Sequence, residues 1–157
     1  TRTVIEEGDA TEDMGETILV PVDESPLSTR AIEFVGREHP EATIHLLHAL
    51  DQVASDYDFD GTSLPASPDG QSARAVENGE RVLEDARESA QTAGLSVTAT
   101  ELVAGRPASQ ITSYAAEHDV DHIVMGSHGR TGLSRILLGS VTERVLRNAT
   151  VPVTVVR

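Results

Sequence analysis

Short apolar runs alternate with segments of helical period along this chain, and the alternation predicts its fold. Residues 17–22 form an apolar run rich in β-branched residues, typical of a buried strand. Ser25 and Pro26 follow as the N-cap and first residue of a helix, which Pro40 ends. Residues 42–50 are apolar except for Thr43, His45 and His48 and do not alternate strictly, which indicates a strand covered on both faces. This part of the chain therefore predicts a strand, a helix and a second strand.

The same alternation continues to the carboxyl end. A helical stripe of apolar residues runs from Val76 to Ala93, and Gly94 suits the position just past the helix end. Further strands are expected at residues 95–103, 121–125 and 151–156, and further helices at 107–115 and 140–148. Strands that alternate with helices imply a doubly wound α/β open sandwich, with five parallel strands and helices on both faces.

The charge balance excludes several functions. Against 26 Asp and Glu the chain has 12 Arg and no Lys, a net charge of −14. We therefore expect no binding to nucleic acid and none to anionic membranes, and a Walker A loop is excluded because it needs a lysine. The acid excess, with two Phe, two Tyr and no Trp, indicates a halophilic protein, since concentrated salt screens the self-repulsion.

The ends and the composition suggest one domain with an extension. Residues 1–16 carry six acidic residues and no apolar period, so we expect a solvated acidic extension before a single domain at 17–157. The sequence lacks a basic signal peptide and any apolar run near the ~20 residues of a membrane span, which predicts a cytoplasmic protein. It has no Cys, which excludes disulfides and thiolate chemistry.

Glycines cluster after the predicted fourth strand. Four of the chain's 12 glycines lie between Gly126 and Gly139. Glycine lets backbone N–H groups approach an anion, and Gly139 and Ser140 open a helix whose N-terminus attracts phosphate. The same residues also fit tight turns, with Ser140-x-x-Glu143 as a capping box. The dinucleotide fingerprint G-x-G-x-x-G is absent, which argues against NAD or FAD.

Three segments resemble the nucleotide-binding universal stress proteins. Gly126-x-x-Gly129, nine residues and then Gly139-Ser140 are similar to the family's G-2x-G-9x-G-(S/T) signature. The segment Val20-Pro21-Val22-Asp23-x-Ser25 resembles its first strand, and residues 152–156 resemble its last. The resemblance extends over residues 17–157.

This resemblance implies a strand order of 3-2-1-4-5, an ATP or AMP pocket, and a homodimer formed through Val151–Val156. Asp23 and Ala49 would serve the adenosine end, with Pro21 and Val22 as the pocket floor. Ala49 is smaller than the valine often found there, which would loosen the packing of adenine. Ribose and phosphates would be lined by Met125, Gly126, Gly129, Gly139, Ser140 and Val141.

Position in the predicted fold adds three residues to this nucleotide-binding set. Gly105 follows the third strand, and ligands bind at the carboxyl ends of strands in such sheets. His128 and Arg130 lie inside the glycine loop. Candidates for phosphoryl transfer are Asp23, His128, Arg130 and a Mg²⁺ carried by the nucleotide; no catalytic residue is assigned, and no metal site made by the protein alone is expected.

We therefore expect a stress-response or signalling module that binds ATP, AMP or ADP with slow or no hydrolysis. Two alternatives stay open: a nucleotide-independent dimeric interaction module, and a true ATPase or phosphotransferase.

Two patterns resemble metal-binding motifs but lack a feature that each motif needs. Asp56, Asp58 and Asp60 imitate half an EF-hand loop, but Ser67 stands where the bidentate Glu is needed. His118 and His122 straddle a predicted helix end and strand start, so they would not share a helical face. His45 and His48 are expected on opposite faces of their strand.

Overall fold

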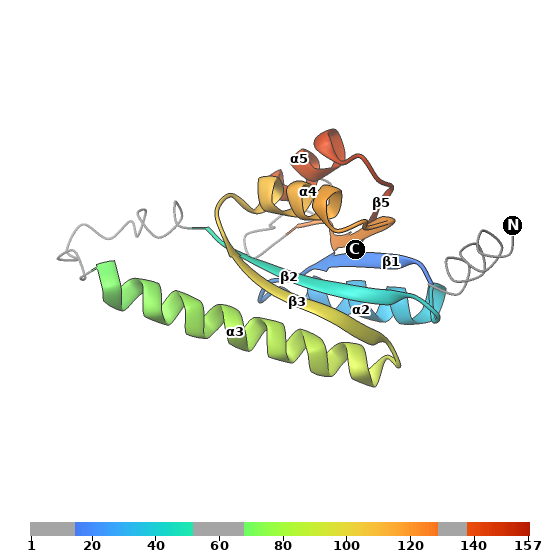
Figure 1. Cartoon of the computed structure of the whole chain (residues 1–157), viewed down its shortest axis with the longest axis horizontal. Helices are drawn as coiled ribbons and strands as arrows, with labels where there is room; N and C mark the ends of the chain where they lie inside the picture. The colour runs from blue at the N-terminus through green and yellow to red at the C-terminus, as the bar shows by residue number, and fades with distance from the viewer. Residues whose placement is uncertain (1–14, 52–67, 129–137) are drawn as a thin grey trace, which may run out of the picture.

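One parallel sheet of five strands forms the centre of the molecule (Figure 1). The computed structural model describes residues 15–51, 68–128 and 138–157. In chain order the elements are β1 (Thr17–Pro21), α2 (Pro26–Glu38), β2 (Thr43–Leu50), α3 (Pro68–Thr92), β3 (Ser96–Ala104), α4 (Pro107–Glu117), β4 (His122–Gly126), α5 (Ser140–Asn148) and β5 (Val153–Val156). The strand order is β3-β2-β1-β4-β5 and every adjacent pair is parallel. The predicted doubly wound open sandwich and its strand order are confirmed.

The sheet is covered on both faces, which explains the continuous apolar runs. Ile18, Leu19 and Val20 in β1 are fully buried. Ile18 and Val20 pack into the core under α2 and α3, whereas Leu19 packs into the core under α4 and α5. Figure 1 shows these two helical layers on opposite sides of the sheet. A strand buried on both faces is apolar at nearly every position.

Local signals set the helix ends as the sequence predicts. The Oγ of Ser25 accepts a hydrogen bond from the backbone N–H of Leu27 at 3.2 Å, and Pro26 opens α2. Gly94 lies just past α3 with φ +77°, in the left-handed region that favours glycine. None of the helices among the described residues is long and apolar enough to cross a membrane.

The burial predicted for one residue of the apolar stripe is wrong. Val76 is 39% exposed, whereas Leu83 and Ala86 on the same helix are buried. The amino-terminal end of α3 extends beyond the ends of the strands in Figure 1. Helical spacing identifies a face, but only the packed partner decides how much of that face is buried.

The topology places a switch point beside β1. The chain passes from β1 to β2 and then to β3 on one side, before it crosses to β4 and β5 on the other. The strand order therefore reverses between β1 and β4. In open α/β sheets, ligands bind outside the carboxyl ends of the strands at such a switch point.

Candidate functional site

Three hydrogen bonds hold Asp23 just beyond the carboxyl end of β1. Its Oδ1 accepts from the backbone N–H of Ser25 at 2.8 Å and from the hydroxyl of Ser28 at 3.0 Å. The Ser28 hydroxyl in turn accepts from the backbone N–H of Asp23 at 2.8 Å. Before it, Pro21 ends β1 and Val22 is buried. The carboxylate is therefore held in one orientation beside the first turn of α2.

The end of β4 packs directly against the same turn of α2. A Cβ added to Gly126 would lie 2.7 Å from the Cβ of Leu27, closer than side-chain carbons pack. Only glycine fits this approach, which brings the last residue of β4 close to the helix start that follows Asp23. Met125, the preceding residue, is buried in the core under α4 and α5.

Gly139 closes the chain back onto the end of β4. Its backbone N–H donates to the carbonyl oxygen of Ser127 at 2.7 Å, and a Cβ added to it would lie 3.0 Å from the Cα of His128. The hydroxyl of Thr142 donates to the carbonyl oxygen of Gly126 at 2.9 Å. The structure thus brings together both ends of the glycine-rich segment that the sequence singled out.

The predicted capping box at α5 is wrong. Gly139 is the N-cap, and no side chain among the described residues caps the amino end of this helix. The backbone N–H of Glu143 donates to the carbonyl oxygen of Gly139 at 2.9 Å, so the helical ladder starts there. The N–H groups of Ser140, Val141 and Thr142 consequently have no acceptor within the helix. Together with the positive end of the helix dipole, they form a surface that suits an anion.

Ala49 and Gly105 lie on the other side of β1. The Nδ1 of His48 lies 2.7 Å from the carbonyl oxygen of Val22, so the residue before Ala49 contacts the end of β1. Gly105 is tied to β2, because its N–H donates to the carbonyl oxygen of Leu50 at 3.0 Å. In the sheet, β2 lies between β1 and β3, the strand that Gly105 follows.

The remaining predicted residues belong to the glycine loop. His128 is half-buried, and its Nδ1 lies 3.0 Å from the Oγ of Ser127. Gly129 and Arg130 lie outside the described residues, as do the EF-hand-like aspartates at 56–60.

A cavity of about 390 Å³ opens beside Asp23, with a volume in the range of small-molecule pockets. Its lining comes from the first turns of α2 and from α3, including Asn78, Arg81 and Asp85. Asp23 is the one predicted site residue in this lining among the described residues. The acids outnumber the single arginine there, so the cavity suits a neutral or cationic group better than a phosphate chain.

Sequence reasoning missed the residues that hold the site in shape. Ser28 fixes Asp23, Leu27 sets the approach of β4, and Ser127 and Thr142 fasten Gly139 and α5 to β4. The position of Ser28, three residues after the N-cap, could have indicated its hydrogen bond to Asp23. Thr142 carries no comparable signal, because its partner is a backbone carbonyl on another element.

A separate polar cluster lies on the α4 side of the sheet. The hydroxyl of Tyr114 is 3.1 Å from Nδ1 of His45, and its ring stacks on His118 at 3.8 Å. Burial first, and then the nearby His118, lower the pKa of His45, while Glu101 opposes the shift. Burial, followed by Glu101, raises the pKa of Tyr114. His48 instead lies next to Gly79 of α3, so the expected opposite placement of the two strand histidines is confirmed.

Known proteins are similar to this chain over nearly its whole length. The family model of the universal stress protein family matches residues 14–157. Universal stress protein MJ0531 of Methanocaldococcus jannaschii is 34% identical over 149 residues, which cover 93% of this chain and 84% of that protein.

Solved structures agree in fold. The structure of hypothetical protein MJ0577 superposes with a TM-score of 0.73 at 31% identity, covering 91% of this chain and 96% of that one. An Archaeoglobus fulgidus universal stress protein in complex with dAMP gives a TM-score of 0.65 at 21% identity, covering 92% and 99%. Universal stress proteins with AMP or cAMP bound also share the fold, at 20% and 24% identity. On its sequence and on its strand order alike, this chain belongs to the universal stress protein family.

Proposed function

We propose that this chain binds an adenine nucleotide at the carboxyl ends of β1 and β4, with ATP, AMP or ADP as candidates. The observation that carries the proposal is the junction at Gly139. There the amino end of α5 is held against Ser127 and His128, and three consecutive N–H groups are left without helical acceptors. Structural neighbours with dAMP, AMP and cAMP support the choice of an adenine nucleotide.

Each end of the proposed site suits a different part of the ligand. Phosphates would lie at Gly139, Ser140 and Val141, where the helix dipole attracts negative charge. The nucleoside would lie near Asp23 and Ala49, over Pro21 and Val22. The remaining members of the proposed set are Gly105, Met125, Gly126, His128, Gly129 and Arg130.

The electrostatics of the chain favour binding through the backbone. With a net charge of −14 and no lysine, the chain has to hold a polyanion with N–H groups and with Arg130. A Mg²⁺ ion bound with ATP would neutralise part of the phosphate charge, and Asp23 is the nearby carboxylate that fits it. Concentrated salt would reduce the unfavourable field of the surface acids.

We infer that the nucleotide acts as a signal or structural ligand in a cytoplasmic stress-response module, with slow or no hydrolysis. Asp23 is engaged by Ser25 and Ser28, which suits a positioning role better than that of a base that moves during turnover. ATP hydrolysis that stops in Asp23→Asn or His128→Ala, while binding survives, would contradict this part of the proposal.

Purification in high-salt buffer, followed by analysis of bound nucleotide and by thermal unfolding with added ATP, tests the binding. We expect ATP to raise Tm. Gly139→Asp should abolish the shift, because it puts a side chain and a negative charge where the phosphates would lie. Leu146→Asp adds the same charge to an exposed position of the same helix and serves as the control. A folded wild-type protein that carries no nucleotide and does not respond to ATP would favour the interaction module instead.

We also propose a homodimer formed through residues 151–156. The β4 ladder uses Pro152 and Val156, since their carbonyl oxygens accept from Ile123 and Ser127. In a parallel ladder, the odd-numbered Val153 and Val155 then present their N–H groups to the open edge. Val155→Pro should therefore weaken the dimer and spare the monomer. Light scattering with size-exclusion chromatography measures this, and an unchanged dimer would contradict it.

A further inference from the structure

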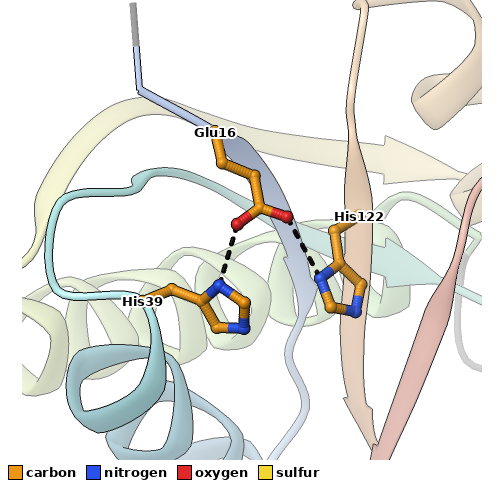
Figure 2. A group of neighbouring side chains, drawn as sticks. All are labelled: Glu16, His39 and His122. Atoms are coloured by element: carbon orange, nitrogen blue, oxygen red, sulfur yellow. Dashed lines mark ion pairs between the residues drawn. The ribbon is translucent and has the colours of Figure 1, made fainter.

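Two histidines and one glutamate meet at the end of the sheet opposite to the candidate nucleotide site (Figure 2). Glu16 precedes β1, His39 is the C-cap of α2, and His122 is the first residue of β4. The Nδ1 of His39 lies 2.8 Å from Oε2 of Glu16, and the Nδ1 of His122 lies 3.3 Å from Oε1. Figure 2 shows both rings directed at the same carboxylate from different elements.

We propose that Glu16, His39 and His122 form a binding site for a divalent transition-metal ion of the Zn²⁺ class. Two imidazole nitrogens and one carboxylate are a donor set that binds Zn²⁺ with a fourth position left for water. Imidazole donors favour such ions over Mg²⁺ and Ca²⁺, which prefer oxygen ligands. The site is independent of nucleotide binding, because it lies at the other end of β1 and β4.

The spacing of the donor atoms fits the ion after small movements. One ligand atom from each residue lies within 4.8 Å of the other two. Tetrahedral Zn²⁺ with bonds of about 2.0–2.1 Å holds its ligand atoms about 3.3 Å apart. The contact between Glu16 and His122 already has this length, and the one between Glu16 and His39 is shorter by only 0.5 Å. The ligand nitrogens of the two histidines lie at most 4.8 Å apart, so the rings have to approach each other by up to about 1.5 Å when an ion binds.

The surroundings of His122 fit a metal ligand. Its Nε2 lies 2.8 Å from Oγ1 of Thr154 in β5. A proton on Nε2 that is donated to this hydroxyl leaves the lone pair on Nδ1, which is the nitrogen that faces Glu16. Metal-bound histidines commonly use their second nitrogen in this way, which orients the ring and fixes the tautomer.

Access and rigidity also suit an ion that comes from solvent. The Glu16 side chain is 38% exposed, while those of His39 and His122 are 27% and 13% exposed. The two rings meet edge to face, with centroids 5.4 Å apart. The backbone at Glu16 is fixed, because its carbonyl oxygen accepts from the N–H of Thr43 at 3.0 Å. The Glu16 carboxylate can thus turn toward an ion from a fixed backbone.

Calorimetric titration of the full chain with Zn²⁺, in excess Mg²⁺ to occupy surface carboxylates, tests the site. We expect one Zn²⁺ per chain and a rise in Tm, and Co²⁺ should give the visible spectrum of a four-coordinate ion. Glu16→Gln, His39→Gln and His122→Gln should each lower the affinity at least ~100-fold, more than loss of an outer-shell partner does. His118→Gln also replaces a helix C-cap histidine, that of α4, and should bind as the wild type does.

Variants of Thr154 test whether the hydrogen bond to His122 supports metal binding. Thr154→Val removes the hydrogen-bond partner of His122 and should weaken Zn²⁺ binding ~10-fold or more, whereas Thr154→Ser should restore it. Circular dichroism checks that each variant is folded. The proposal is overturned if folded wild-type protein shows no saturable Zn²⁺ binding. Binding that is unchanged in His122→Gln would overturn it as well.

Discussion

Thr142→Val tests whether a single hydrogen bond holds the amino end of α5 in the candidate site. Thr142 is 2% exposed, and its hydroxyl donates to the carbonyl oxygen of Gly126 at 2.9 Å. Valine has nearly the same shape, so the substitution removes the hydroxyl and keeps the packing. The end of β4 and the first turn of α5 then lose this side-chain link.

The expected loss of stability follows from the partial burial of this bond. A hydrogen bond contributes about 0.5–1.5 kcal/mol net, and a carbonyl left without its partner in a buried place costs about 1–3 kcal/mol. We therefore expect the free energy of unfolding to fall by about 1.5 kcal/mol. For a chain of this length that lowers Tm by about 3–6 °C.

Urea unfolding followed by circular dichroism measures the stability, and thermal shift with ATP measures the proposed binding. Thr142→Ser is the matched control, since it keeps the hydroxyl and loses a methyl worth about 0.8 kcal/mol. We expect the serine variant to keep its nucleotide affinity and the valine variant to lose part of it. If Thr142→Val is as stable as the wild type while Thr142→Ser is not, packing rather than the hydrogen bond positions α5, and the reasoning is refuted.

Three further predictions concern pH, backbone strain and salt. Burial and His118 lower the pKa of His45 in the folded chain below its ordinary 6.5, so the unfolded chain binds the proton more readily. Stability should therefore decline as pH falls from 6.5 through the folded pKa, and His45→Gln should flatten this part of a Tm-against-pH curve. Gly105→Ala should cost about 1–3 kcal/mol in urea unfolding, because φ is +138° there, and an added Gln110→Ala should not restore it, since the strain lies in the backbone. Raising KCl from about 0.1 M to about 1 M shortens the Debye length from about 10 Å to about 3 Å, which screens the repulsion among the acidic residues. With a net charge of −14, Tm should rise by several degrees. An unchanged Tm would argue against adaptation to salt.

Local sequence signals were sufficient for the type and order of the elements. Strands buried on both faces require continuous apolar runs, and helix ends are set by neighbours such as Ser25, Pro26 and Gly94. The glycine segment could also be recognised, since the close approach at Gly126 leaves no room for a side chain and the one at Gly139 leaves little. These features depend on steric and hydrogen-bonding rules that act over a few residues.

Contacts between elements decide the features that local sequence patterns do not predict. The pattern Ser140-x-x-Glu143 fits a capping box by itself, but the bond from Gly139 to Ser127 selects Gly139 as the N-cap. Val76 fits the buried stripe by spacing, yet its side chain is 39% exposed. In both cases a partner on another element decides between structures that the local pattern allows equally.

The sequence by itself determined a parallel α/β sandwich with a glycine-rich turn, because hydrophobic period and glycine sterics are local properties. Only the tertiary structure decided which distant side chains meet. Glu16, His39 and His122 come together because β4 pairs beside β1 and α2 ends where β1 begins. Thr142 reaches Gly126 for the same kind of reason. Such meetings depend on strand order and crossover geometry, which no spacing along the chain encodes.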